Sequence, residues 1–332
     1  MQQLALLVAL VPALSFAGSV SAYSGCKRLG SEREACMKCL ASGAFYQPGQ
    51  GCGMVEGMHR SKSVGTDKPP PRPTAMPKAG KDYVTIPAGS FDIGARETDP
   101  DKDADTEVFD ARVTLTRAFL MKTTEVTQGE YYFVMGKVTA CWEKRYPLEA
   151  PANCVSWNDA VLYLNELSKK EKLEPCYEIK EGLAKWKGYD CTGYRLPTEA
   201  EWEWAARGGT EEPRYGELKE VAWFYENSGD GELHPVGKKK PNAYGLFDML
   251  GSVWEWSFDG WEYKPYAGEV TDPMVGGDTL KTTFEDRIRR GGAFSEQGYS
   301  VRAQIRSRYG ANSGGKDQGF RPVRTLKEKK KD

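Results

Sequence analysis

The residues with the clearest chemical potential lie in one stretch, Asn242–Trp256, with the sequence NAYGLFDMLGSVWEW. Asp248 and Glu255 stand seven residues apart in it, on either side of Gly251. Carboxylates combined with backbone carbonyls at a turn are the ligands that a hard cation such as calcium prefers. By spacing alone, we favour the simpler interpretation, a buried strand with two solvated acids, and we keep the calcium site as the alternative.

The end of this stretch, from Val253, is predicted to be a strand, and it carries Glu255. Trp254 and Trp256 alternate with Val253 and Glu255, so the two indoles share one face. Two large aromatic side chains on one face need a core to bury them. We therefore expect a central strand here.

Three helices are predicted by capping boxes, in which a polar N-cap is followed three residues later by an acid. The acids Glu199, Glu201 and Glu203 at the third helix suggest acid/base chemistry, but in a first turn they offset the helix macrodipole, and we favour that role. Strands are expected at Tyr83–Ile86 and Ser90–Ile93, as a hairpin, and at Val113–Lys122. The helices are expected at Thr127–Met135 (box Thr127–Glu130), Ser156–Lys170 (Ser156–Asp159) and within Tyr194–Gly209 (Thr198–Glu201).

The chain is expected to begin with a secretory signal, cleaved before Tyr23 and followed by no transmembrane segment. A retained membrane helix is the alternative, and lipidation at Cys26 ranks below free secretion because Tyr23 stands where a small aliphatic residue is usual. The predicted segments are a signal peptide (1–22), a Cys-rich module (23–60), a Pro-rich linker (61–81), a globular domain (82–326) and a charged tail (327–332).

Charge and cysteine content bound the function. Lysine plus arginine (46) and aspartate plus glutamate (47) nearly cancel, which removes the electrostatic case for a nucleic-acid binder. Eight cysteines in a chain with a predicted signal indicate an oxidising compartment, secreted, periplasmic or at the cell surface, with disulfides.

The cysteines form two groups. Loop-local disulfides Cys141–Cys154 and Cys176–Cys191 are the economical pairing, because each would close an irregular loop beside a helix. The N-terminal four are expected to pair among themselves in one of three connectivities, with a zinc or redox site as the alternative. They are Cys26, Cys36, Cys39 and Cys52.

Five ordered blocks resemble one known family: YRLPTEAEWEWAARGG from Tyr194, HPVG from His234, PNAYGLFDMLGSVWEW from Pro241, RRGGAF from Arg289, and GFR from Gly319. Together they are similar to the formylglycine-generating enzyme, or sulfatase-modifying factor, family, over about residues 83–325. The resemblance implies an α+β fold, a variant of the C-type lectin architecture with short antiparallel strands, few helices and much ordered loop. The placement of the four later cysteines also resembles that of bacterial members.

The resemblance makes structural calcium the favoured interpretation of the Asp248–Glu255 stretch. Carried over by position, Asp248 and Glu255 would supply side-chain oxygens, and Gly251 and Val253 backbone carbonyls. Ser252 departs from the family pattern, which has asparagine after this glycine.

The catalytic residues that the resemblance implies are missing. Formylglycine-generating members oxidise a substrate cysteine with copper and oxygen, using two cysteines after the Gly-Gly pair, because soft copper(I) prefers thiolates. Counted from Gly291, those positions are Glu296 and Val301, and no cysteine follows Cys191. The sequence therefore argues against copper and against the oxidase activity. With only His59 and His234, it also argues against the His-held iron of other branches.

Arginines gather near the C-terminal end. They suit either a cleft for an anionic ligand or ion pairs with buried acids such as Asp248 and Glu255, and we favour the ion pairs. The overall hypothesis is a calcium-stabilised binding or structural module that takes a protein, peptide or glycan ligand outside the cytoplasm. The alternative is an enzyme of the family, either the oxidase or altered oxidoreductase chemistry in the same cleft, with Glu296, Arg302 and Arg306 as candidates. The arginines are Arg287, Arg289, Arg290, Arg302, Arg306, Arg308 and Arg321.

Overall fold

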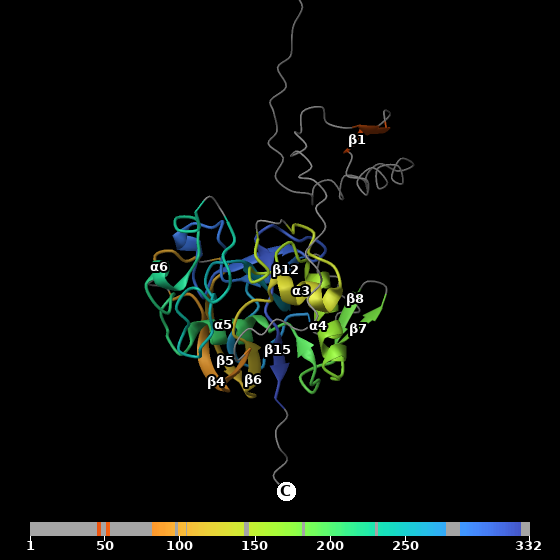
Figure 1. Cartoon of the computed structure of the whole chain (residues 1–332). Helices are drawn as coiled ribbons and strands as arrows, with labels where there is room; N and C mark the ends of the chain where they lie inside the picture. The colour runs from red at the N-terminus through yellow and green to blue at the C-terminus, as the bar shows by residue number, and fades with distance from the viewer. Residues whose placement is uncertain are drawn as a thin grey trace, which may run out of the picture. The chain divides into compact units, whose positions relative to one another are not determined.

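A computed structural model of the chain describes residues 45–47, 51–53, 82–96, 99–103, 105–142, 146–180, 183–229, 232–276 and 286–326 (Figure 1). The chain divides into two units, Met1–Lys68 and Pro69–Asp332. In the first, β1 (Phe45–Gln47) pairs antiparallel with β2 (Gly51–Gly53). The predicted signal peptide, pairing of the N-terminal cysteines, linker up to residue 81 and charged tail lie outside the described residues.

The second unit is built on short strands in four sheets. Its first sheet has the order β3-β6-β15-β9, all antiparallel, with the C-terminal strand inserted between strands from much earlier in the chain. These strands are β3 (Tyr83–Ile86), β6 (Phe119–Lys122), β15 (Val323–Thr325) and β9 (Tyr194–Arg195).

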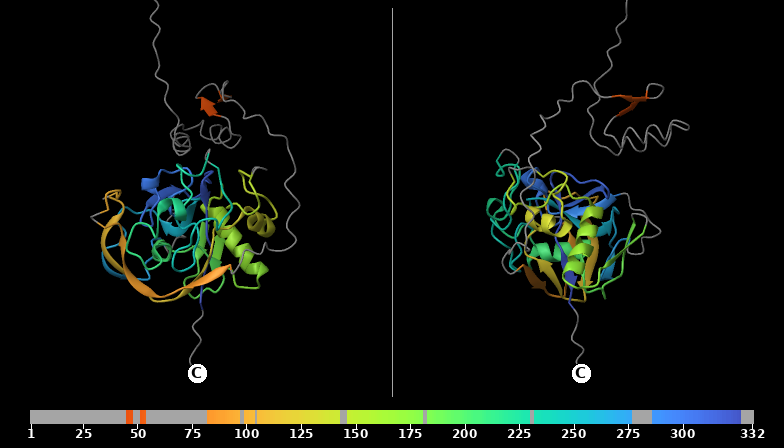
Figure 2. Two further views of the ribbon diagram at one scale, coloured as in Figure 1. Left: turned by 60° about the vertical axis from the view of Figure 1, so that its left-hand side comes forward. Right: turned by 45° about the vertical axis from the view of Figure 1, so that its right-hand side comes forward.

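The other sheets extend the unit on both sides. In Figure 2, β4 and β5 form a long curved ribbon. The sheets are β11-β5-β4, with β4 (Gly89–Gly94), β5 (Val108–Leu115) and β11 (Gly268–Thr271); β13-β12-β10-β14, with β10 (Trp254–Gly260), β12 (Asp286–Arg290), β13 (Arg306–Gly310) and β14 (Gln318–Gly319); and β7-β8, with β7 (Tyr177–Lys180) and β8 (Leu183–Trp186).

The three predicted helices are confirmed, each with both hydrogen bonds of its capping box. They are α3 (Gln128–Met135), α4 (Trp157–Lys170) and α5 (Glu199–Arg207), to which α6 (Leu218–Val221) and a 3-10 turn at Gly298–Ser300 are added. No described helix is long and apolar enough to cross a membrane. Few helices among many short strands confirm the α+β class.

The expected hairpin of Tyr83–Ile86 with Ser90–Ile93 is wrong. The first segment pairs with β6 and the second with β5, so the connection at Pro87 leads from one sheet into another. Trp204 of α5 holds this connection, because its indole donates to the Pro87 carbonyl at 2.8 Å and packs on Phe91. The expected strand Val113–Lys122 is likewise divided between β5 and β6.

The expected central strand is confirmed. β10 lies between β12 and β14, and all seven of its residues are buried. Two cores flank it, one around Trp202 of α5 and one around Trp157 of α4. The disulfides Cys141–Cys154 and Cys176–Cys191 are both present, and each closes an irregular loop near α4, as expected.

Candidate functional site

The centre of the site is a buried ion pair between Glu255 of β10 and Arg321. The Arg321 guanidinium donates to Glu255 Oε1 from Nη2 at 2.7 Å and to Oε2 from Nε at 3.1 Å. The Trp202 indole donates to Oε2 at 2.8 Å. Both charged side chains are at most 1% exposed. This short bidentate geometry is of the strongest ion-pair type.

Arg321 also ties the surrounding loops together. Its Nη1 donates to the Lys122 carbonyl at 3.0 Å, and its Nη2 donates to the Phe247 carbonyl at 2.8 Å. A second carboxylate, that of Glu125, lies 3.8 Å from the same guanidinium. One cation therefore joins the end of β6, the segment before β10, and β10 itself.

Two carboxyl groups beside this pair are incompletely hydrogen-bonded. Both oxygens of Glu125 and Oδ1 of Asp248 are buried with none, whereas Asp248 Oδ2 accepts from the Gly237 amide at 2.6 Å. Burial raises the pKa of Glu125 well above its usual range, and the neighbouring charge of Asp248 adds to this. Burial also raises the pKa of Asp248 to about 6, against the opposing effects of the Gly237 amide and Arg321. The cluster thus holds more carboxyl groups than Arg321 alone can balance, and burial favours their neutral forms.

The residues fit the implied calcium ion only in part. The turn is formed as expected, because Asp248, Gly251 and Ser252 adopt φ values of 56°, 73° and 58°, and a Cβ at position 251 would lie 2.1 Å from the Trp223 carbonyl oxygen. The free oxygen of Asp248 suits a cation. Glu255, however, is already engaged by Arg321 and Trp202.

Glu125 is the residue of this cluster that sequence reasoning missed. Its two oxygens, which approach Arg321 only to 3.8 Å, would complete a cation site more readily than those of Glu255. Within the described ranges, no three His, Cys, Asp or Glu side chains are grouped to hold a metal ion. The one sequence signal for Glu125 was an acid three residues after the apolar strand that ends at Lys122.

The two positions that replace the family's cysteines differ in their surroundings. Glu296 is half-buried and accepts a hydrogen bond from the Trp254 indole at 3.2 Å. Val301 is fully buried in the core that contains Trp202. Within the described residues of 82–326, all four cysteines are in disulfides. No thiol is therefore available in that part of the chain.

The loop that carries Glu296 is interlocked with a second loop. The Tyr225 amide donates to the Glu296 carbonyl at 2.9 Å, and the Gly298 amide donates to the Glu226 carboxylate at 3.3 Å. Tyr225 and Tyr299 project from these loops and are 61% and 57% exposed. We refer to Tyr225, Glu226, Glu296 and Tyr299 as the Glu296 surface. Exposed aromatic residues beside carboxylates are suited to contact a partner.

The other two cleft candidates, Arg302 and Arg306, are placed inside ion pairs and not along an open cleft. Arg302 bonds to Glu107 at 2.8 Å, and Arg306 bonds to Glu199 at 2.5 Å. All four side chains are at most 2% exposed. Their partners come from segments about 200 and 100 residues away, so they join distant parts of the fold. Neither guanidinium is open to a ligand.

Comparison with known proteins places this geometry in context. Residues 69–326 match the sequence model of a protein family, the sulfatase-modifying factor enzyme 1-like domain. The chaperone protein LppX of Paenibacillus barcinonensis is 30% identical over 279 residues, which are 74% of this chain and 89% of that protein. The mouse formylglycine-generating enzyme is 30% identical over 192 residues, 52% of this chain and 43% of the mouse protein.

Two solved structures agree with these matches. The Treponema denticola variable protein 1 superposes with a TM-score of 0.63 at 30% identity, over 74% of this chain and 95% of that one. PvdO from Pseudomonas aeruginosa gives 0.61 at 28% identity, over 74% and 96%. Both likenesses extend over nearly the whole of the compared chain.

We predict that Arg321→Met lowers the free energy of unfolding by about 3–5 kcal/mol, because it leaves Glu255 charged and buried without its partner. Urea unfolding at pH 7.5 measures the effect. The control is Arg112→Met, since Arg112 pairs with Asp92 at 2.9 Å but both side chains are more than half exposed. We expect this control to cost less than about 1 kcal/mol. Equal losses in the two variants would contradict the central role of Arg321.

Proposed function

Since the chain belongs to the family of proteins with a sulfatase-modifying factor enzyme 1-like domain, we propose that it is a member without formylglycine-generating oxidase activity that acts as a binding module outside the cytoplasm. The observation that carries this proposal is the replacement of the two expected thiolate positions by Glu296 and Val301. A carboxylate is a poor ligand for copper(I), and a valine is none. The burial of Val301 in the core supports the same conclusion.

The Glu296 surface is the proposed contact for the ligand. It joins two strongly exposed tyrosines with the carboxylates of Glu226 and Glu296. Tyrosines supply large contact area at a low cost in side-chain entropy. A relative that aligns over most of its length is named a chaperone protein, which supports a protein ligand over a glycan or a free peptide.

The proposed location is secreted, periplasmic or at the cell surface. The apolar N-terminal stretch and the eight cysteines support it. So do the disulfides Cys141–Cys154 and Cys176–Cys191. Anchoring through a lipid on Cys26 ranks below free secretion, because Tyr23 stands where a lipoprotein cleavage site usually has a small aliphatic residue.

We predict that the purified protein does not convert the cysteine of a sulfatase-type peptide to formylglycine in the presence of copper and oxygen. Mass spectrometry of the peptide gives the readout, with mouse formylglycine-generating enzyme as the positive control. Turnover, and not copper binding, is the decisive quantity, because Cys26, Cys36, Cys39 and Cys52 would bind copper wherever they are reduced. Conversion above the level without protein would overturn the proposal in favour of the alternative, an active enzyme of this family.

We predict that Tyr225→Ala combined with Tyr299→Ala weakens capture of an exported protein partner at least tenfold. Each anchoring aromatic residue at an interface is worth about 1–2 kcal/mol or more. The partner is first identified by cross-linking from position 225, and its affinity is then measured by surface plasmon resonance. The control is Tyr263→Ala, because Tyr263 is 60% exposed but lies outside the Glu296 surface. Equal affinity of the double variant and the control would place the ligand elsewhere.

Calcium is proposed as a stabilising ion at Asp248. The free oxygens of Asp248 and Glu125 support this placement, because calcium is bound by oxygen ligands and offsets buried negative charge. The resemblance to the family implies that the backbone carbonyls of Gly251 and Val253 complete the set of ligands. Glu255 is expected to stay with Arg321 and not to bind the ion.

We predict that 10 mM calcium raises the free energy of unfolding relative to a chelator. For a Kd of 0.1–1 mM, typical of extracellular modules, the gain is about 1.4–2.7 kcal/mol. Asp248→Asn should abolish the gain, whereas Arg112→Gln, an exposed charge change elsewhere, should keep it. No gain in the unaltered protein, or an equal gain in Asp248→Asn, would contradict the site.

A further inference from the structure

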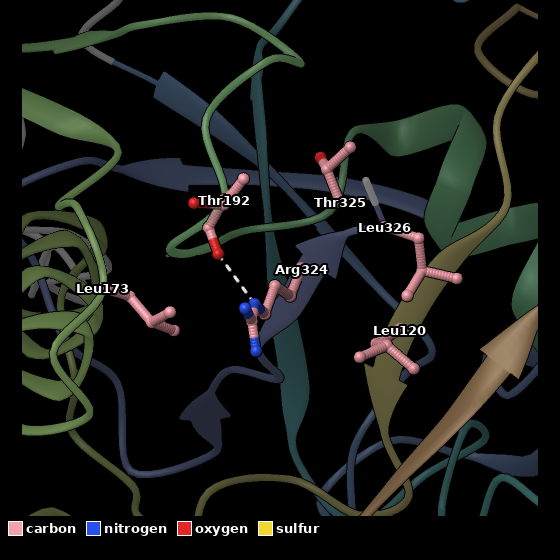
Figure 3. Close-up of a pocket in the computed structure, with 6 residues that line it drawn as sticks. All are labelled: Leu120, Leu173, Thr192, Arg324, Thr325 and Leu326. Atoms are coloured by element: carbon pink, nitrogen blue, oxygen red, sulfur yellow. Dashed lines mark hydrogen bonds between the residues drawn. The ribbon is translucent and has the colours of Figure 1, made fainter. Parts of the chain in front are cut away.

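A pocket of about 310 Å³ opens on the sheet β3-β6-β15-β9, and its lining shares no residue with the Glu296 surface or with Glu125, Asp248, Glu255 and Arg321. Figure 3 shows Arg324 in the midst of the lining, with leucines on either side of it. The volume is at the lower end of the range for small-molecule sites. The lining residues are Leu120, Leu173, Thr192, Arg324, Thr325 and Leu326.

The pocket results from the alternation of the strands. Phe119, Met121 and Val323 are buried in the core that contains Trp202. Leu120 and Arg324, which are register partners on β6 and β15, therefore point to the opposite face. Leu173, in the turn after α4, supplies a further wall. Both register partners remain half-buried.

Arg324 differs from the buried arginines in the partners of its guanidinium group. Its Nε donates to the Thr192 carbonyl at 2.7 Å, and its guanidinium lies 6.0 Å from the centre of the Tyr194 ring. Arg302, Arg306 and Arg321 each pair with carboxylates. By contrast, no carboxylate of the described residues forms an ion pair with Arg324. Its terminal nitrogens are available to an anion in a pocket that is otherwise apolar.

We propose that this pocket binds a single-chain carboxylate of medium length, with its carboxylate on Arg324 and its chain against Leu120, Leu173 and Leu326. The apolar lining explains the chain, and the Arg324 guanidinium, which has no ion pair among the described residues, explains the anionic head. The small volume excludes a two-chain lipid.

The first test compares three ligands on the unaltered protein by isothermal titration calorimetry. They share a ten-carbon chain and differ only in the head: decanoate, decanol and decylammonium. We expect decanoate to bind at least tenfold more tightly than decanol, and decylammonium to bind most weakly. This comparison needs no variant, so it does not depend on whether a substituted protein folds.

The second test uses substitutions in the pocket. Arg324→Gln should weaken decanoate binding about tenfold and leave decanol binding unchanged, whereas Arg324→Lys, which keeps the charge, should weaken it only two- to threefold. Leu173→Gln should weaken decanoate and decanol alike. Arg112→Gln is the control for removal of an arginine elsewhere and should bind as the unaltered protein does. Thermal unfolding checks that each variant is folded.

Three results would overturn the proposal: no saturable binding of decanoate, equal affinity for decanoate and decanol, or unchanged decanoate affinity in a folded Arg324→Gln variant. The proposal does not depend on the Glu296 surface. Loss of both exposed tyrosines should leave decanoate binding intact.

Discussion

The fold depends on the burial of one guanidinium among carboxylates. Arg321 balances Glu255 directly and lies 3.8 Å from Glu125, and its hydrogen bonds to the carbonyls of Lys122 and Phe247 join three chain segments. A buried charge is costly unless it is paired and hydrogen-bonded, so each of these segments is held where it satisfies the cation. Trp202, which donates to Glu255, connects this cluster to the core under α5.

The same principle is repeated through the domain. Arg302 with Glu107 and Arg306 with Glu199 join segments that are far apart in the chain, in a unit with short strands and much irregular backbone. Such pairs offer less net stability than apolar packing of equal volume, but they are directional and need specific partners. They can therefore hold loops that cannot pack as regular elements. The buried carboxyl groups of Glu125 and Asp248 are the place where we propose that a metal ion adds to the same design.

The ion pairs of the arginines also determine which parts of the domain remain open to a ligand. Those that pair with buried acids are closed to ligands, whatever their position relative to the family's catalytic stretch. The Glu296 surface instead presents two tyrosines, and the pocket presents Arg324, which has no ion pair among the described residues. The two sites that we propose thus differ in chemistry according to which charges the fold has already neutralised.

The sequence by itself determined the local structure. The three capping boxes, the central strand at Trp254–Trp256 and the two loop-local disulfides depend on neighbours within about fifteen residues, and each was predictable. Only the tertiary structure decided which strands pair and which charges meet. Tyr83–Ile86 pairs with β6 and not with Ser90–Ile93, and Glu255 pairs with Arg321, 66 residues later. These choices depend on the path of the whole chain, because a hydrogen-bonding edge or a buried carboxylate accepts whichever distant partner the packing of the core brings to it.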